Sequence, residues 1–389
     1  MSGDPLNIAL ITPYELARNH GTGAQLLTLL SCKEISFLHF YWTRYTWLSE
    51  TKNSFQLRDD AIRIPRLRRF QPALNRWLGW WKGDKINRTW LALFCKLKGR
   101  KFDLCYVIVT SESDCERAHS IVQAMGLPYV VHIMDLVHEN GVNPGMLGMA
   151  RLLNGASGII ALSPTIREEL QKLTRARIDQ VPIGQPVSRH FAAAPETAGR
   201  FRIVMVGHPH DGGIKLLARS VDALKSLKPG LEIVYIGAHF PKSARGFVQD
   251  LGFIPDDDDY RRTIATAQVA YLTGPCDLDC YGRYSFPSRT AEFLMAGLPI
   301  IGCVPRGSAT VRMLEPLIPA CVVPVNTPGE LVDAVRAFTA SLGSWSQASS
   351  LAREFAIGNF GIDLVRQRIL EILNRVLQER VDSRVSGKN

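Results

Sequence analysis

The feature that most constrains the fold is an alternation of short apolar runs with amphipathic helical patterns along almost the whole chain. Asn7–Thr12, Leu104–Val109, Gly158–Leu162 and Phe201–Val206 are such runs, and each is followed, after a loop, by a helical pattern. Parallel strands need a crossover connection, which is usually a helix. The alternation therefore predicts parallel sheets in an α/β fold.

The pattern occurs in two successive series of similar size. Between them, Gly184–Gly199 contains Gln, Pro and Ala without periodicity, which predicts a linker. The chain has 389 residues, more than one ordinary hydrophobic core holds. We therefore expect two facing Rossmann-like domains with a cleft between them, an N-terminal one over residues 1–185 and a C-terminal one over residues 200–360.

Several cellular settings are disfavoured by composition. No run reaches the ~18–20 apolar residues that a membrane-spanning helix needs. The start, MSGDPLNIALITP, lacks a basic region and a cleavage site, so we expect no signal peptide. The eight cysteines are scattered, and Cys276 and Cys280, the closest pair, have no second pair or His cluster near them. These features favour a reduced, cytoplasmic protein without a zinc site.

The basic residues are concentrated in one segment. The net charge of the chain is +10, and residues 62–101 carry twelve Lys and Arg against one acid, Asp84, so the remainder is close to neutral. The segment also contains Trp77, Trp80, Trp81 and Trp90. Tryptophan with Lys and Arg favours an anionic membrane surface, here the inner face of the cell membrane. Single-stranded nucleic acid and a solvated face with core tryptophans are the alternatives.

Ser285–Gly302, SFPSRTAEFLMAGLPIIG, predicts a loop, a helix and a buried strand. Pro287 suits the first helical turn, Ser285 or Ser288 can supply an N-cap oxygen, and Gly297 ends the helix.

The start of this predicted helix has the residue types that bind a nucleotide sugar. A helix N-terminus offers N–H groups and partial positive charge to a phosphate. Arg289 adds a guanidinium fork, and Glu292, one turn later, can accept hydrogen bonds from ribose hydroxyls.

This segment resembles the donor-site signature of GT-B glycosyltransferases, chiefly the retaining enzymes of glycosyltransferase family 4. In that family a Glu just before a run like FLMAGLPII binds the ribose, and Glu292 matches it. Tyr284 stands where the family usually has an earlier Glu that contacts the donor sugar. The resemblance implies a GT-B fold whose last helix, here 361–380, returns to the first domain. The tail at 381–389 is polar, and we expect it to be disordered.

Two further segments match the donor half of the family. In GHPHDGGIK, Gly207 to Lys215, glycines between a strand and a helix let backbone N–H groups approach a phosphate. The resemblance implies that Lys215 holds the donor diphosphate, with His208 in place of the commoner Arg; a plain turn with a surface Lys is the alternative. It also implies that Gly252 and Ile254 meet the base.

Two acidic motifs can suggest a metal. Asp256–Asp259 follows Pro255, and Asp in that place favours capping of a helix over metal binding. Asp277 and Asp279 form a D-x-D sequence. Because so short a motif often occurs by chance, a surface loop is favoured over a metal site. A further hypothesis is that Asp277 or Asp279 supplies the sugar contacts absent at Tyr284. We expect no metal cofactor.

The candidates for catalysis lie in the first half. PYVVHIMDLVH resembles the family strand that ends at the cleft, which puts His132 beside the reacting carbon and makes Asp135 an orienting group or base. A structural His132 is equally expected. Gly21, Thr22 and Gly23 resemble the loop over the donor sugar, and an ordinary strand–helix turn is as well supported.

Together these features predict a metal-independent glycosyltransferase. It would transfer a sugar from a UDP- or GDP-linked donor to a lipid-linked or saccharide acceptor, in polysaccharide or glycolipid synthesis at the cytoplasmic membrane face. Lys215, Arg289 and the helix start at Ser288 would stabilise the leaving diphosphate. A GT-B-fold epimerase and a non-enzymatic basic protein that binds nucleic acid or membrane are the alternatives.

Overall fold

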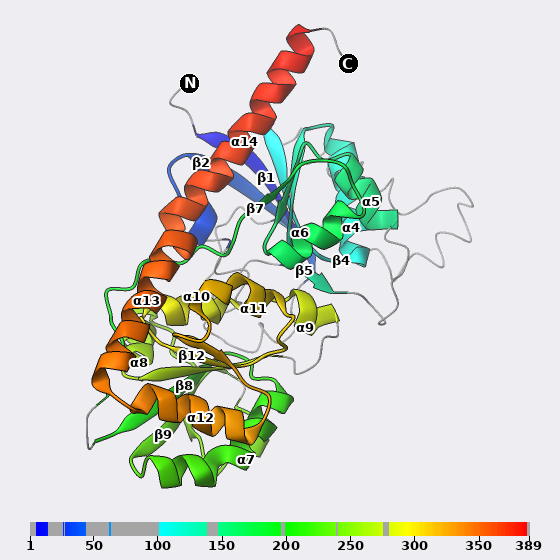
Figure 1. The fold of residues 1–389 in the computed structure, drawn as a ribbon. Coiled ribbons are helices and arrows are strands. Elements are labelled where there is room, and N and C mark those ends of the chain that lie inside the picture. Colours follow the sequence, from blue (N-terminus) through cyan, green and yellow to red (C-terminus); the bar gives the residue numbers. More distant parts are fainter. Residues whose placement is uncertain are drawn as a thin grey trace. The chain divides into compact units, whose positions relative to one another are not determined.

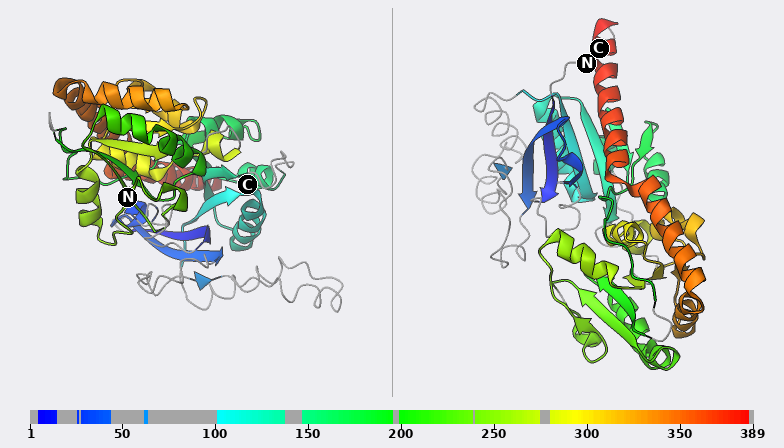
Figure 2. Two further views of the ribbon diagram at one scale, coloured as in Figure 1. Left: turned by 90° about the horizontal axis from the view of Figure 1, so that it is seen from below. Right: turned by 90° about the vertical axis from the view of Figure 1, so that its left-hand side faces the viewer.

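The computed structural model describes residues 5–14, 26, 28–43, 62–63, 101–137, 147–195, 199–238, 240–274 and 280–386. Gly21–Gly23, Asp277, Asp279 and nearly all of the basic segment 62–101 lie outside these residues. The chain divides into two compact units (Figures 1 and 2). The first comprises Met1–Leu162, Ile166–Val181 and Arg366–Asn389, and the second comprises Ser163–Thr165 and Pro182–Val365.

The first unit contains a parallel sheet of seven strands in the order β3-β2-β1-β4-β5-β6-β7. Its strands are β1 (Leu6–Tyr14), β2 (Ile35–Thr43), β3 (Ile62–Arg63), β4 (Leu104–Ser111), β5 (Tyr129–Val137), β6 (Gly158–Ala161) and β7 (Ile178–Gln180). The helices that follow these strands are α4 (Glu112–Met125), α5 (Leu147–Asn154) and α6 (Pro164–Gln171).

The second unit contains a parallel sheet of six strands in the order β10-β9-β8-β11-β12-β13. Its strands are β8 (Phe201–Val206), β9 (Leu231–Ile236), β10 (Gln249–Asp250), β11 (Val269–Thr273), β12 (Ile300–Cys303) and β13 (Val322–Pro324). Its α-helices are α7 (Asp211–Leu227), α8 (Asp257–Ala265), α9 (Cys280–Tyr284), α10 (Ser288–Met295), α11 (Ala309–Met313), α12 (Pro328–Thr339) and α13 (Leu342–Phe360), with 3₁₀ turns η3 (Lys242–Ala244) and η4 (Glu315–Leu317).

The central strands of each sheet are buried on both faces, which explains their continuous apolar sequences. In the second unit, α7 and α12 pack together on one face of the sheet, and α10 and α13 pack together on the other (Figure 1). Both sheets have the strand order of a doubly wound Rossmann fold: all strands are parallel, and the order in which successive strands join the sheet reverses between β1 and β4 and again between β8 and β11.

The last helix, α14 (Ile362–Val385), belongs to the first unit from Arg366 onward. Arg366 donates hydrogen bonds to the carbonyls of Leu29 and Ser31, and Arg375 forms an ion pair with Asp179. The helix continues past residue 380, where the sequence placed the start of a polar tail. None of the described helices has the length and apolarity to cross a membrane.

The segment expected to be a linker is instead packed on the second unit from Pro182 to Pro195. The backbone N–H of Ala192 donates to the carbonyl of Ala296 at 2.7 Å, and that of Ala193 donates to the carbonyl of Ala265 at 2.8 Å. These carbonyls lie at the C-terminal ends of α10 and α8, where helices leave acceptors without partners inside the helix. The segment lacks periodicity because it satisfies helix ends rather than forming an element of its own.

Candidate functional site

The switch point of the second sheet is the first place to look for a ligand. In open α/β sheets, ligands bind outside the carboxyl ends of the strands where the strand order reverses. Here β8 ends at Val206, and its neighbour β11 ends at Thr273.

Arg289 spans this switch point. It is the second residue of α10, and its guanidinium donates to the carbonyls of Val206, His208 (3.1 Å) and Thr273 (2.8 Å). Two of these carbonyls end adjacent strands. A positively charged group is therefore held at the strand ends by the backbone itself.

The loop after β8 has a backbone conformation that lets other groups approach it closely. Gly207 has φ 79°, which favours glycine, and a Cβ there would lie only 3.0 Å from Arg289 Nη1. The Tyr235 hydroxyl donates to the Gly207 carbonyl at 2.6 Å. His208 is exposed, and so is Lys215, the fifth residue of α7. Lys215 thus lies at the beginning of the second helical turn.

The start of α10 differs from the expected capping. Pro287 occupies the N-cap position, and no side chain caps this helix. Ser288 is the first helical residue, and Ser285 is buried, with its carbonyl accepting from the Thr310 hydroxyl at 3.1 Å. The prediction that Ser285 or Ser288 caps the helix is wrong. Because Pro has no polar side chain, the first-turn N–H groups lack the oxygen that a Ser cap would supply.

The end of α10 is as predicted. Gly297 has φ 75°, its N–H donates to the Leu294 carbonyl at 2.9 Å, and the Leu298 N–H donates to the Phe293 carbonyl at 2.9 Å. This is a Schellman motif.

Glu292 lies one turn into α10 and lines a small pocket with Gln185, Pro186, Ser188, Tyr260 and Met295. The Tyr260 hydroxyl donates to Glu292 Oε2 at 2.7 Å, and Gln185 Nε2 donates to Oε1 at 3.4 Å. Burial raises the pKa of Glu292, while the hydrogen bond from Tyr260 and the charges of Arg261 and Arg289 oppose that rise.

The segment expected to meet the base contains a glycine in the left-handed conformation. Gly252 has φ 69°, and its N–H donates to Asp250 Oδ1 at 2.9 Å. Ile254 is half-buried, and Phe253 beside it is 54% exposed. Tyr284 is buried, with the Arg283 guanidinium 5.5 Å from its ring centroid.

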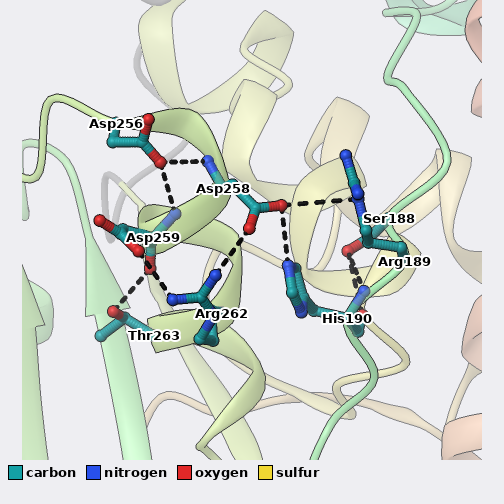
Figure 3. A network of polar contacts seen from close by, with 8 residues as sticks. All are labelled: Ser188, Arg189, His190, Asp256, Asp258, Asp259, Arg262 and Thr263. Carbon is teal, nitrogen blue, oxygen red and sulfur yellow. Dashed lines mark hydrogen bonds and ion pairs between the residues drawn. The ribbon is translucent and has the colours of Figure 1, made fainter.

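The acidic run caps a helix, as predicted. Asp256 is the N-cap of α8, and its carboxylate accepts from the backbone N–H groups of Asp258 and Asp259. Asp258 also accepts a hydrogen bond from His190 Nε2 (2.9 Å) and forms an ion pair with Arg262 (2.8 Å) (Figure 3). The hydrogen bond from His190 is the main cause that lowers the pKa of Asp258. The run thus fixes α8 and joins it to the segment before β8.

In the first unit, His132 has the environment of a core residue. It lies within β5, between Ile108 of β4 and Ile160 of β6, and is 2% exposed. Its Nδ1 is 2.8 Å from the Tyr106 hydroxyl, and burial lowers its pKa to about 3. This placement is the structural alternative that the sequence left open, and contact with a reacting carbon stays a prediction.

Asp135 is three residues further along β5, where the register against β4 shifts between Ile133 and Val137. Its side chain is partly exposed, and burial raises its pKa to about 7. A carboxyl group with that pKa can take up and release a proton near neutral pH.

No protein-family model matches the chain, and no curated protein matches its sequence. Solved structures do match over almost the full length. Anabaena HepE, in complex with UDP and glucose, has a TM-score of 0.67 at 13% identity, covering 94% of this chain and 99% of HepE. Sucrose-phosphate synthase from Thermosynechococcus elongatus has a TM-score of 0.66 at 14% identity, covering 96% and 100%. The lipopolysaccharide outer core galactosyltransferase WaaB has 0.59 at 14%, covering 96% and 100%.

The chain has the GT-B fold. Within this GT-B chain, the structure gathers Gly207, His208 and Arg289 at one switch point, and it pairs Glu292 with residues that the sequence did not indicate. No role was predicted for Tyr260, and Gln185 fell within the expected linker. The one sequence signal for Tyr260 is its spacing from Ile264, which is buried four residues later in α8, because residues four apart share a helix face.

Proposed function

We propose that this GT-B chain is a glycosyltransferase that takes a sugar from a nucleotide diphosphate donor bound by the second unit. The observation that carries the proposal is Arg289, whose guanidinium is held at the carboxyl ends of β8 and β11, directly at the start of a helix without a side-chain cap. Positive charge and helix N–H groups at a switch point suit a diphosphate.

The donor residues have separate roles in this proposal. Arg289, Lys215 and the first-turn N–H groups of α10 stabilise the diphosphate as it leaves, without a metal ion. Gly207 and His208 form the wall of the phosphate site, Gly252 and Ile254 contact the base, and Glu292 accepts from the ribose. Tyr284 and Ser285, just before α10, face the donor sugar. UDP is the first nucleotide to test, because HepE is described in complex with it.

The acceptor half of the proposal rests on Asp135. A carboxylate with a pKa of about 7 can accept the proton of an attacking hydroxyl at neutral pH. His132, neutral and buried, supports the strand from which Asp135 projects. We propose a saccharide or lipid-linked saccharide as acceptor, in line with the name of WaaB, and transfer with retention as in family 4. The basic segment 62–101 would dock the enzyme on the cytoplasmic face of the membrane.

Nucleotide affinity tests the donor site. We expect UDP- or GDP-sugars to raise the melting temperature, because a ligand that binds only the folded state stabilises it. Arg289→Ala should lower nucleotide affinity on the order of 100-fold, since it removes a charge-assisted phosphate contact. Arg306→Ala, a matched control on an exposed arginine of the same unit, should leave affinity unchanged. Equal affinities for wild type and Arg289→Ala would refute the donor site.

A further inference from the structure

The carboxylate of Glu292 is held at both of its oxygens. Tyr260 donates to Oε2 at 2.7 Å and Gln185 donates to Oε1 at 3.4 Å, from two segments that are far apart in sequence. Gln185 is 7% exposed, and Tyr260 is only partly exposed. A surface glutamate needs no such pair of partners, so the arrangement fixes the direction in which the carboxylate points.

Both partners are themselves anchored. Tyr260 lies in the first turns of α8, whose start is capped by Asp256 and tied through Asp258 to His190 (Figure 3). The backbone of Gln185 donates to the Phe360 carbonyl at 2.7 Å and accepts from the Ile362 N–H at 2.9 Å. A residue at the end of such anchored segments can hold another side chain in one orientation, as a well-built binding site requires.

The Glu292 carboxylate can still accept hydrogen bonds from a ligand. An ionised carboxylate has about four lone-pair sites, and two remain once Tyr260 and Gln185 have donated. Two acceptor sites on one carboxylate match two neighbouring hydroxyl groups of a sugar ring. We propose that Tyr260 and Gln185 are positioning residues, which orient Glu292 toward the 2′- and 3′-hydroxyls of the donor ribose. This inference rests on the proposed nucleotide site.

The protonation state of Tyr260 also suits this role. Burial and the adjacent Glu292 raise its pKa well above the usual value, so its hydroxyl keeps the proton that it donates. The same hydrogen bond counters the burial that raises the pKa of Glu292, and so favours the ionised, accepting form.

The test compares nucleotides that differ in the ribose. UDP, GDP and ADP are titrated by calorimetry against wild type, Tyr260→Phe and Gln185→Met, and each is then replaced by its 2′,3′-dideoxy form, which lacks both ribose hydroxyls. We expect Tyr260→Phe to weaken the best ribonucleotide about tenfold, the size of one hydrogen bond to a charged group. Against the dideoxy form, the same substitution should cost at most about twofold, because both hydroxyls that would donate to Glu292 are already gone.

Thr263→Val is the matched control. It removes a hydroxyl from the same helix, where Thr263 donates to the Asp259 carbonyl and does not contact Glu292. It should leave all affinities unchanged. Equal losses for ribo and dideoxy forms in both Tyr260→Phe and Gln185→Met would assign these residues a structural role and overturn the inference. Binding of no nucleotide to the wild type would instead overturn the proposed function, and this inference with it.

Discussion

Two residues of β5 show how the local environment decides which side chain can transfer a proton. His132 and Asp135 are three residues apart on β5, yet burial lowers the pKa of the first to about 3 and raises that of the second to about 7. Both shifts favour the neutral form, as desolvation requires. At neutral pH His132 is therefore uncharged and Asp135 is near its midpoint, which makes Asp135 the better candidate for proton transfer.

The pKa of His132 predicts an acid-sensitive stability. An unfolded chain protonates His near pH 6.5, whereas the folded protein does so only near pH 3. Between these values the unfolded state binds more protons, so stability falls as the pH is lowered, by up to about 1.4 kcal/mol per pH unit from this residue. In urea unfolding from pH 7 to 4, His132→Gln should lose less stability than wild type. Thr263→Val, which removes no titratable group, should follow wild type, and identical slopes for all three proteins would contradict the assignment.

At the scale of elements, α10 is held by α13. Arg353 of α13 donates to the Met295 carbonyl at the end of α10 and to the Ser188 carbonyl at 2.9 Å. Gly297, which ends α10, lies against Ser349 of α13. The helix that carries Arg289 and Glu292 is thus fixed at its C-terminal end by the hydrogen bond from Arg353 and by the close packing of Gly297 against Ser349.

Substitution by alanine should change stability in opposite directions at two glycines in this region. Gly297 has φ 75°, and a Cβ there would lie 2.8 Å from Ser349 Oγ and 3.3 Å from the Ser349 carbonyl oxygen, so Gly297→Ala should destabilise the protein by more than about 1 kcal/mol. Gly358, an exposed residue within α13, has nothing within 4 Å of a Cβ. Gly358→Ala should stabilise by about 0.5–1 kcal/mol through helix propensity. Thermal unfolding measures both, and changes of the same sign would refute the argument.

The same helices show what the sequence could and could not predict. Strands with continuous apolar runs, such as β4 and β8, and the helix between Pro287 and Gly297 were predicted, because their signals are local. The helix α13 was missed: its buried face consists mainly of Ala348, Ala352 and Ala356, whose small side chains give no apolar periodicity.

The partners of the site residues were beyond prediction for a different reason. Arg289 was expected to point at a phosphate, and the structure engages it with the strand-end carbonyls of Val206 and Thr273. Tyr260 and Gln185 meet Glu292 only through the tertiary fold. Contacts between residues 32 and 107 positions apart have no sequence pattern of their own.

At the scale of the whole molecule, the basic charge is confined to one segment. Residues 62–101 hold twelve of the 46 Lys and Arg and one of the 36 acids, while both parallel sheets and their helices lie almost wholly in the near-neutral remainder. A doubly wound fold does not need such a segment. We therefore propose that the charge and four tryptophans of this segment serve an external anionic partner, and for a GT-B chain with a proposed saccharide acceptor the membrane surface is the partner we test.

Binding to lipid vesicles tests whether the basic segment binds a membrane surface. We expect sedimentation with vesicles that contain anionic phosphatidylglycerol, no sedimentation with pure phosphatidylcholine, and release at high salt, because each Lys or Arg near an anionic surface contributes about 1 kcal/mol that salt screens.

Reversing Arg66, Arg68 and Arg69 to Glu should reduce binding on the order of 100-fold or more. Reversing the exposed Arg219, Lys225 and Lys242 of the second unit makes the same change in net charge and should leave binding intact. Equal losses in the two triple variants would mean that net charge alone drives binding, and a preference of the wild type for single-stranded DNA over the vesicles would favour nucleic acid as the partner.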